Sequence, residues 1–221
     1  MHSQEPAALR LVWGASARPT RGPKARFTLE QVVDAGIAVA DKQGVGELSL
    51  AAVSERLGLV TTALYRYVSS KDELVELMVD RALGSPASCD GTEWRIRAEQ
   101  WTAELLARYA KHPWIVSLQP SGAPRHPNRV AWIDAILADL ADGQVAAPLL
   151  VALILDSLAR TFAPFAVSSA PDPLPAWLED LIAERHPRFA GELTRDWGGL
   201  DDDFRAAVRV VIDGATVTTA H

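Results

Sequence analysis

Hydroxyl, aromatic and basic side chains are concentrated in one short stretch, residues 61–71. The stretch carries Thr61, Thr62, Tyr65, Arg66, Tyr67 and Lys71. Only Ala63 and Leu64 in its first two turns are suited to packing inside. Side chains of the other types can donate hydrogen bonds to phosphate oxygens, and arginine is the commonest reader of guanine. The stretch therefore predicts a surface that binds a polyanion, although a solvated arginine is an equal alternative for Arg66.

The common catalytic and metal-binding motifs are absent from the sequence. It contains no His-Glu-x-x-His, no Gly-x-Ser-x-Gly, no Gly-rich phosphate loop and no metal-ligand cluster. His112, His126 and His186 each precede a proline, which is typical of helix ends and turns. Cys89 lies in a Ser/Pro/Gly stretch and is interpreted as a spectator. We therefore expect no catalytic residue, metal or cofactor, with a helical enzyme as a remote alternative.

Capping residues and glycines predict the helices that must position residues 61–71. The predicted N-caps are Thr28 (in a capping box with Gln31), Ser49, Thr61 and Ser70, and the predicted stops are Gly44, Gly58 and Gly84. Residues 49–67 thus read as a short helix, a Gly-led turn and a second short helix. This is the helix-turn-helix pattern, in which the second helix enters the major groove of DNA.

The remainder of the chain also predicts helices and no convincing strand. Apolar stripes and proline or glycine boundaries place them at about 94–112, 128–143, 148–165, 177–185 and 201–216, with Asn128 as a cap. The segment 149–165 is apolar almost all round, so we expect it to be buried on more than one side. The predicted fold is all-α: a three-helix helix-turn-helix domain on a larger helical domain.

The two parts of the chain differ in charge. Residues 1–71 carry nine Lys/Arg and six Asp/Glu, whereas the whole chain has a net charge of −6. Residues 1–26 contain several prolines and glycines, and no regular structure is predicted there. Arg21, Lys24 and Arg26 in this segment could form a flexible basic arm that follows phosphates, and a solvated tail is the alternative. The absence of a signal peptide, the single cysteine and an apolar run too short for a membrane predict a cytoplasmic protein outside the membrane.

Aromatic residues are enriched in the second half of the chain and suit an apolar pocket between helices. The pocket candidates are Trp101, Trp114, Trp132, Asp156, Arg160, Phe162, Phe165 and Trp177. Core packing is the alternative for each aromatic residue. Asp156 and Arg160 share a helix face, so they form either a structural ion pair, a polar anchor for a ligand or a contact across a dimer. The dimer-interface candidates are Leu153, Phe204, Val208, Val211 and Ile212.

Residues Phe27 to Leu83 resemble the tetracycline-repressor-like (TetR) family, above all in the pattern Leu-Tyr-x-Tyr-Val-x-x-Lys-x-x-Leu that begins at Leu64. The resemblance implies that Thr28 and Ser49 touch phosphates at helix N-termini. It also implies that Thr61, Thr62 and Tyr65 face bases or nearby backbone, and that Tyr67 and Lys71 hold phosphates. Members generally carry a smaller or imidazole side chain at the position of Tyr67. A four-helix dimer interface is implied as well.

Three domains are therefore expected: a flexible arm (1–26), a DNA-binding domain (27–73) and an effector-binding and dimerisation domain (74–221). The expected function is a repressor that binds a palindromic operator as a homodimer and is released by a small, largely apolar molecule. An activator or a ligand-independent repressor fits the sequence equally well. The sequence names neither the effector nor the operator.

Overall fold

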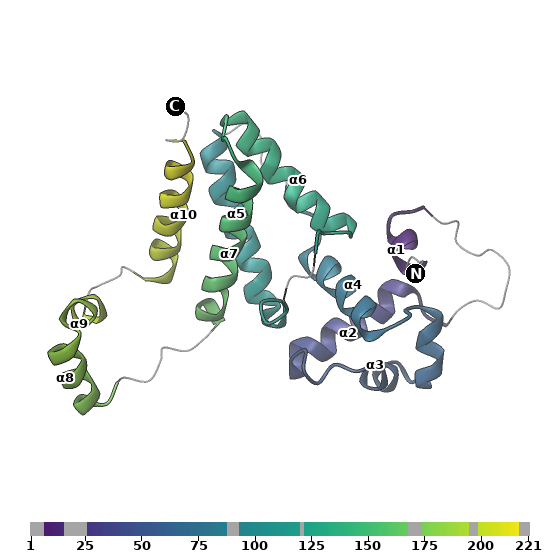
Figure 1. The fold of residues 1–221 in the computed structure, drawn as a ribbon. Coiled ribbons are helices and arrows are strands. Elements are labelled where there is room, and N and C mark those ends of the chain that lie inside the picture. The colour runs from purple at the N-terminus through teal and green to yellow at the C-terminus, as the bar shows by residue number, and fades with distance from the viewer. Residues whose placement is uncertain are drawn as a thin grey trace.

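The structure, a computed structural model, describes residues 7–15, 26–87, 93–119, 122–167, 174–194 and 199–216. Within these ranges it contains helices and no strand (Figure 1). The first group is α1 (Ala7–Val12), α2 (Leu29–Gln43), α3 (Leu50–Leu57), the 3₁₀ helix η1 (Thr61–Arg66) and α4 (Lys71–Leu83). The second is α5 (Trp94–Lys111), η2 (Pro113–Ile115), α6 (Pro127–Asp142), α7 (Pro148–Val167), α8 (Ala176–Arg185), α9 (Pro187–Leu193) and α10 (Leu200–Thr216). The all-α prediction is confirmed.

Side-chain caps fix the helices around the helix-turn-helix as the sequence predicts. Thr28 and Gln31 form the reciprocal capping box: the Thr28 hydroxyl accepts from the Gln31 N–H, and the Gln31 side chain accepts from the Thr28 N–H at 2.8 Å. Ser49 and Ser70 each accept a backbone N–H at 3.1 Å at the starts of α3 and α4. Gly58 ends α3 in the left-handed region, with φ of 63°, which only glycine adopts without strain.

Two predicted caps are wrong. The N-cap position of η1 is Val60, and Thr61 instead places its hydroxyl 3.1 Å from that of Ser54 on α3. Helix α6 begins at Pro127, and the side chain of Asn128 leaves its own helix to donate to Asp80 of α4. In both cases a contact with another helix has replaced a local hydrogen bond, which sequence spacing does not show.

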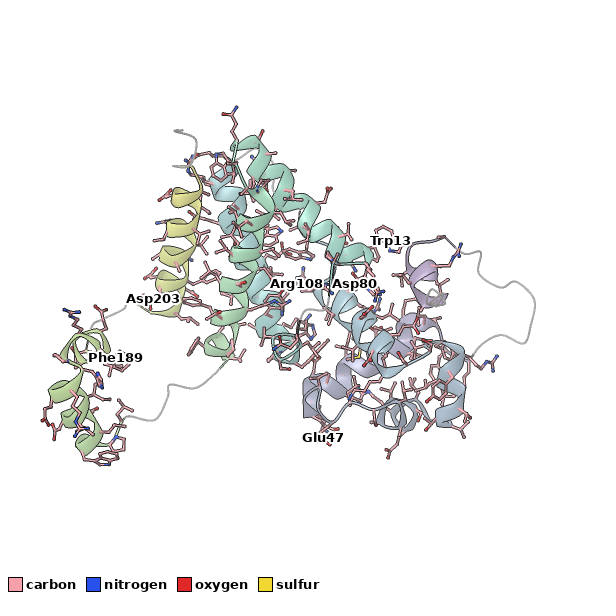
Figure 2. The ribbon with its side chains drawn as sticks, viewed as in Figure 1. Trp13, Glu47, Asp80, Arg108, Phe189 and Asp203 are labelled. Atoms are coloured by element: carbon pink, nitrogen blue, oxygen red, sulfur yellow. The ribbon has the colours of Figure 1, made fainter. Side chains whose placement is uncertain are left out.

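Residues 7–12 form a helix where the sequence predicted no regular structure. Ala8 of α1 is buried, and the Trp13 indole N–H donates to the carbonyl of Arg125, just before α6, at 2.8 Å. Figure 2 shows Trp13 beside the start of α6. This part of the predicted flexible arm is therefore docked on the protein, while Arg21 and Lys24 lie outside the described residues.

Helix α4 connects two helical units (Figure 1). On one side, α2, α3 and η1 pack with α4 around fully buried side chains such as Val32, Val53 and Leu64. On the other side, α5, α7 and α10 lie side by side, and α6 slants from this bundle to α4. The α8–α9 hairpin stands apart from the bundle in the same view. Helix α6 therefore contacts both the bundle and α4, which is part of the helix-turn-helix unit.

Helix α7 is buried on one face only, whereas burial on more than one side was predicted. Val151, Ala152 and Leu155 face the bundle. The other face exposes Leu149, Leu150, Leu153, Ile154, Phe165 and Val167. By length and composition, α7 is the one helix in the described ranges that could cross a membrane, with 28% of its apolar window buried. The same composition also suits a helix whose outer face is covered by another protein chain.

Candidate functional site

The helix-turn-helix presents its polar side chains to solvent and packs its apolar ones inside. Leu64 is buried at 0% exposure, as predicted, and with Val68, which is 2% exposed, it anchors η1 and the following turn. Thr62 and Arg66 are exposed, and Tyr65 is 59% exposed. An exposed tyrosine on a short helix leaves both its ring and its hydroxyl available for a partner. The arrangement can insert the face of η1 into a groove.

Two exposed cationic side chains, those of Arg66 and Lys71, flank this face. Among the described residues, the side chains of Arg66 and Lys71 form no hydrogen bond or ion pair, and both are exposed. Lys71 is the first residue of α4, where free backbone N–H groups and the helix dipole also favour an anion. Arg26, the described member of the predicted arm, lies with Nη1 3.5 Å from the Gly58 carbonyl in the turn. Its position brings the end of the arm to the helix-turn-helix.

The N-cap hydroxyls of Thr28 and Ser49 are exposed and already accept hydrogen bonds from their helices. A hydroxyl that accepts an N–H retains its own proton, which it can donate to a phosphate oxygen. Tyr67 is half-buried and packs against the core, so only its outer part is available. Thr61 is also half-buried because of its contact with Ser54.

Helix α6 is joined to the C-terminal end of α4 by hydrogen bonds from Asn128, Arg129 and Trp132. The Asn128 amide donates to the Asp80 carboxylate at 3.0 Å and to its carbonyl at 3.1 Å, and the Arg129 N–H donates to the carboxylate at 2.9 Å. The Trp132 indole donates to the Gly84 carbonyl at 2.8 Å. Burial raises the pKa of Asp80 above its ordinary value. Figure 2 shows Asp80 at this junction.

A second junction joins α2 to η2. One oxygen of Asp41 lies 2.8 Å from His112 Nδ1 and accepts the Trp114 indole N–H at 2.7 Å. His112 and Trp114 are 7% and 4% exposed. The end of α2, one helix away from the predicted recognition segment, is thus fixed to the larger domain by one carboxylate.

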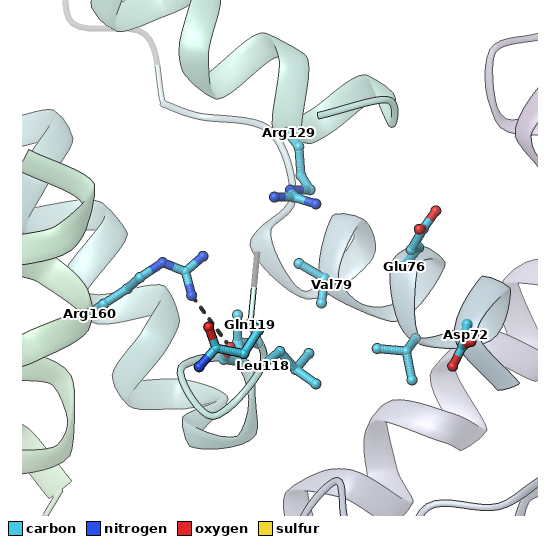
Figure 3. A pocket seen from close by; sticks show the side chains of 9 residues that line it. Asp72, Glu76, Val79, Leu118, Gln119, Arg129 and Arg160 are labelled. Atoms are coloured by element: carbon cyan, nitrogen blue, oxygen red, sulfur yellow. Dashed lines mark hydrogen bonds between the residues drawn. The ribbon is translucent and has the colours of Figure 1, made fainter. Parts of the chain in front are cut away.

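Two neighbouring cavities lie between α4 and the bundle. The aromatic cavity, about 240 Å³, is open on one side and is lined mainly by α5, α6 and α7, and its walls include Trp101, Tyr109, Trp132 and Asp156. The α4 cavity, about 180 Å³, is lined by Val75 and Val79 of α4 and by residues that follow η2 (Figure 3). Arg129 and Arg160 line both cavities. A ligand held here would touch α4 and the bundle together.

The polar wall of the aromatic cavity is a connected group of three side chains. The Tyr109 hydroxyl donates to Asp156 at 2.5 Å, and Arg160 Nε donates to the other oxygen of Asp156 at 2.8 Å. The Arg160 guanidinium also lies over the Tyr109 ring, 4.7 Å from its centroid. Burial, and then the charge of Asp156, raise the pKa of Tyr109 far above its ordinary value. Tyr109 therefore stays protonated and serves as a permanent donor.

Four of the eight predicted pocket residues line the aromatic cavity: Trp101, Trp132, Asp156 and Arg160. The structure places the other four elsewhere. Trp114 is buried against Asp41, and Phe162 packs edge-on against Phe204 with ring centroids 5.3 Å apart. Phe165 and Trp177 are 63% and 67% exposed. Aromatic composition alone did not distinguish a cavity wall from a helix interface or a surface.

Sequence reasoning missed Tyr109 and Arg129. Tyr109 continues the stripe Trp101–Leu105 by four residues, and Arg129 lies three residues before Trp132, on the same face of its helix. Helical spacing from the predicted pocket tryptophans could have found both residues.

Most of the predicted dimer-interface side chains pack inside the protomer. Phe204, Val208 and Ile212 are at most 3% exposed, and Val211 is half-buried against the core. Their stripe on α10 faces α5 and α7 of the same chain. Leu153 is different, since it is 49% exposed on the outer face of α7.

The described geometry defines a class of protein, a helix-turn-helix protein with a cavity-bearing helical second domain. Residues 32–78 match the family model of bacterial regulatory proteins, tetR family. The transcriptional repressor DrrR1 of Streptomyces coeruleorubidus is 36% identical over 150 residues, 66% of this chain and 56% of that protein. A transcriptional regulator of Saccharopolyspora erythraea is 31% identical over 133 residues, 59% of this chain and 56% of that protein. The chain thus spans little more than half the length of these relatives.

Solved structures share the fold. Apo ActR from Streptomyces coelicolor has a TM-score of 0.75 and 20% identity, covering 88% of this chain and 97% of that chain. ActR in complex with actinorhodin has a TM-score of 0.69 and 16% identity, covering 89% of this chain and 100% of that chain. Residues 32–78 are thus similar to the tetR family of bacterial regulatory proteins, the curated relatives are named transcriptional regulators, and the solved structures share the fold over most of the chain. The prediction from the Leu64–Leu74 pattern is thereby confirmed.

Proposed function

We propose that the chain is a cytoplasmic transcriptional repressor that binds a palindromic operator as a homodimer and is released by a small, largely apolar molecule. The observation that carries the proposal is the face of η1, where Thr62, Tyr65 and Arg66 are exposed and unpaired among the described residues. A short helix with exposed hydrogen-bonding groups can enter the major groove of DNA and contact base edges and phosphates. DrrR1, which the chain resembles, is named a repressor.

In this proposal two protomers associate through the outer faces of α7 and α10. The exposed apolar stripe on α7 includes Leu150 and Ile154. The outward residues of α10 include Ala206 and Val210, the latter 73% exposed. Burying these side chains against a second copy removes their apolar surface from water. A two-fold dimer would place two copies of η1 on successive turns of one DNA face, which gives useful affinity to short recognition helices.

The effector would act by moving α6 relative to α4. A ligand in the two cavities touches α4, α6 and α7, and the hydrogen bonds of Asn128, Arg129 and Trp132 carry a shift of α6 to the end of α4. Such a ligand releases DNA only if it binds the two arrangements with different affinity. A coupling of about 1–3 kcal/mol changes operator affinity roughly 5–150-fold. Solved complexes of ActR with actinorhodin and (S)-DNPA are precedents for ligand binding in this fold.

Selection from a random duplex DNA pool tests the proposal. The wild-type chain should enrich an inverted repeat, and the Thr62→Ala, Tyr65→Ala double variant should lose it, because each lost base contact weakens binding by about 1–3 kcal/mol. The matched control is Phe189→Ala, Thr194→Ala, which removes an exposed aromatic and an exposed threonine from the distant α8–α9 hairpin. This control should select the same repeat as the wild type.

The outcomes separate the alternatives. If no repeat is enriched even at low salt, where phosphate contacts are strongest, the DNA-binding proposal fails. A reporter with the repeat placed across or upstream of a promoter distinguishes a repressor from an activator. A ligand that releases DNA should quench tryptophan emission, since Trp101 and Trp132 line the cavity. Unchanged emission with every releasing ligand contradicts the cavity as the effector site.

A further inference from the structure

Two guanidinium groups from different helices converge on the boundary between the two cavities. Arg129 comes from the first turn of α6 and Arg160 from α7, and both line the aromatic cavity and the α4 cavity. Figure 3 shows both side chains directed into the space between the helices. Each is half-buried, so water screens their charges less than on the surface.

The Arg129 guanidinium has no ion-pair partner in the part of the chain that the structure describes. Within the described residues its guanidinium forms no hydrogen bond or ion pair, although its backbone N–H donates to Asp80. Arg160, in contrast, shares Asp156 with Tyr109 and lies with Nη1 3.5 Å from the Ile115 carbonyl. The group of Tyr109, Asp156 and Arg160 is neutral as a whole, and Arg129 adds to this wall a guanidinium that forms no ion pair with any carboxylate of the described residues.

The other acidic side chains of the described residues near the boundary form no ion pair with the Arg129 guanidinium. Both oxygens of Glu76 accept from Arg125 at 2.8 Å, which neutralises that carboxylate. Asp72 is exposed at the start of α4 and lies apart from both arginines in Figure 3. Asp80 accepts from the Asn128 amide and the Arg129 backbone N–H, which are neutral donors, so it keeps its charge, and within the described residues it forms no ion pair with the Arg129 guanidinium. An unpaired, half-buried guanidinium beside a cavity is a ready site for an anionic oxygen group of a ligand.

The aromatic side chains of the cavity indicate the shape and polarity of the rest of such a ligand. The rings of Trp101 and Trp132 pack edge to face with centroids 5.6 Å apart. Their indole N–H groups are already used, since Trp101 donates to the Trp132 carbonyl at 2.9 Å and Trp132 donates to Gly84 at 2.8 Å. These side chains therefore offer ring surface and no free donor, which favours a flat apolar body.

We propose that the effector is an aromatic acid, with its ring system in the aromatic cavity and its carboxylate bound between Arg129 and Arg160. This inference rests on the proposed function and names the chemical class of its effector. Binding the carboxylate draws the first turn of α6 toward α7. Because Arg129 and Asn128 also bind Asp80 through hydrogen bonds at 2.9 and 3.0 Å, the same movement pulls on α4. In this proposal the carboxylate both holds the ligand in the site and causes the movement of α6.

Carboxylates matched with their uncharged amides test the inference. The probes are benzoate, 2-naphthoate and 9-anthracenecarboxylate, each beside its carboxamide, titrated into the full chain while tryptophan emission and heat are recorded. The wild type should prefer at least one carboxylate over its amide by about tenfold or more, as expected for a charge-assisted hydrogen bond. Arg129→Met should abolish this preference while amide affinity stays within about threefold, since its alkyl chain remains to pack. Arg129→Lys should restore part of the preference.

Controls separate this site from general charge effects and from misfolding. Arg188→Met removes an exposed arginine on α9 and should leave the preference unchanged. The thermal midpoint of Arg129→Met should match the wild type, because within the described residues the guanidinium has no partner to lose. If no carboxylate is preferred over its amide, or if the preference survives in Arg129→Met, the inference is overturned.

Operator binding, measured on the same preparations, distinguishes this failure from failure of the proposed function. A chain that selects an inverted repeat and shows no carboxylate preference refutes only the effector class. A chain that prefers carboxylates through Arg129 and selects no DNA supports the anion site and refutes the repressor.

Discussion

The Asp41 carboxylate should contribute more to stability than its surface position suggests. Asp41 lies near the end of α2, and its side chain is 36% exposed. One of its oxygens nevertheless contacts both His112 and Trp114, which belong to the larger domain and are almost fully buried. Asp41→Ala leaves these two buried nitrogens without their acceptor, and it disconnects α2 from η2.

The magnitude follows from the number of lost partners. A buried donor left unsatisfied costs about 1–3 kcal/mol. Two effects reduce this loss. Water can enter the partly exposed space left by the carboxylate and bind the two donors, and removing a negative charge near a helix C-terminus stabilises the helix by about 0.5 kcal/mol. We therefore expect Asp41→Ala to lower the free energy of unfolding by about 2–4 kcal/mol. Asp41→Asn keeps an oxygen acceptor, so its effect should be smaller.

Asp34→Ala is the matched control on the same helix. Asp34 pairs with Arg81 of α4, but the two side chains are 51% and 44% exposed. An exposed pair contributes about 0.2–1 kcal/mol, and both substitutions replace aspartate by alanine within the same helix. Urea unfolding followed by circular dichroism and tryptophan emission, at one fixed protein concentration, measures the difference. Equal losses in the two variants would refute the reasoning from buried donors.

Three further outcomes are expected. Gly58→Ala should lower the free energy of unfolding by about 1–2 kcal/mol, because φ is 63° and alanine is strained in the left-handed region. The control Gly46→Ala should be nearly neutral. Equal urea midpoints for the two variants would contradict the expected strain at Gly58. In a spectrophotometric titration, Tyr109 should ionise only when the protein unfolds, because its pKa is raised in the folded state. The free energy of unfolding should therefore fall as the pH rises above about 10, where the phenol ionises in the unfolded chain. A Tyr109→Phe variant that kept this delayed step would exclude the assignment. Ile154→Glu, on the exposed face of α7, should convert a dimer into the 23.9 kDa protomer in sedimentation, and a persisting dimer would locate the interface elsewhere.

The helix-turn-helix was predictable because its determinants are local. The capping box of Thr28 and Gln31 and the left-handed stop at Gly58 involve residues within a few positions of each other. The same holds for the exposure of Thr62 and Tyr65 beside buried Leu64, since helical periodicity assigns residues to faces. Short-range hydrogen bonds and periodicity are properties of the sequence itself.

The larger domain was predicted as helices, but its site was predicted only in part. Trp101 and Trp132 line the aromatic cavity as expected, whereas Trp114 has the same composition signal and lies at a domain junction. Phe204 has an apolar periodicity that fits either a dimer interface or a core, and the structure buries it in the protomer. One helix face looks the same in sequence whichever element covers it.

The sequence by itself determined most of the helices, with α1 and α9 as exceptions, their boundaries near glycine and proline, and the polar face of the recognition segment. Only the tertiary structure decided that Arg129 and Arg160, thirty-one positions apart in sequence, line the same two cavities, and that Asn128 and Asp80 couple α6 to α4. The physical reason is that caps and periodicity act within one helix, whereas a cavity and a charge without a partner are defined by several helices at once.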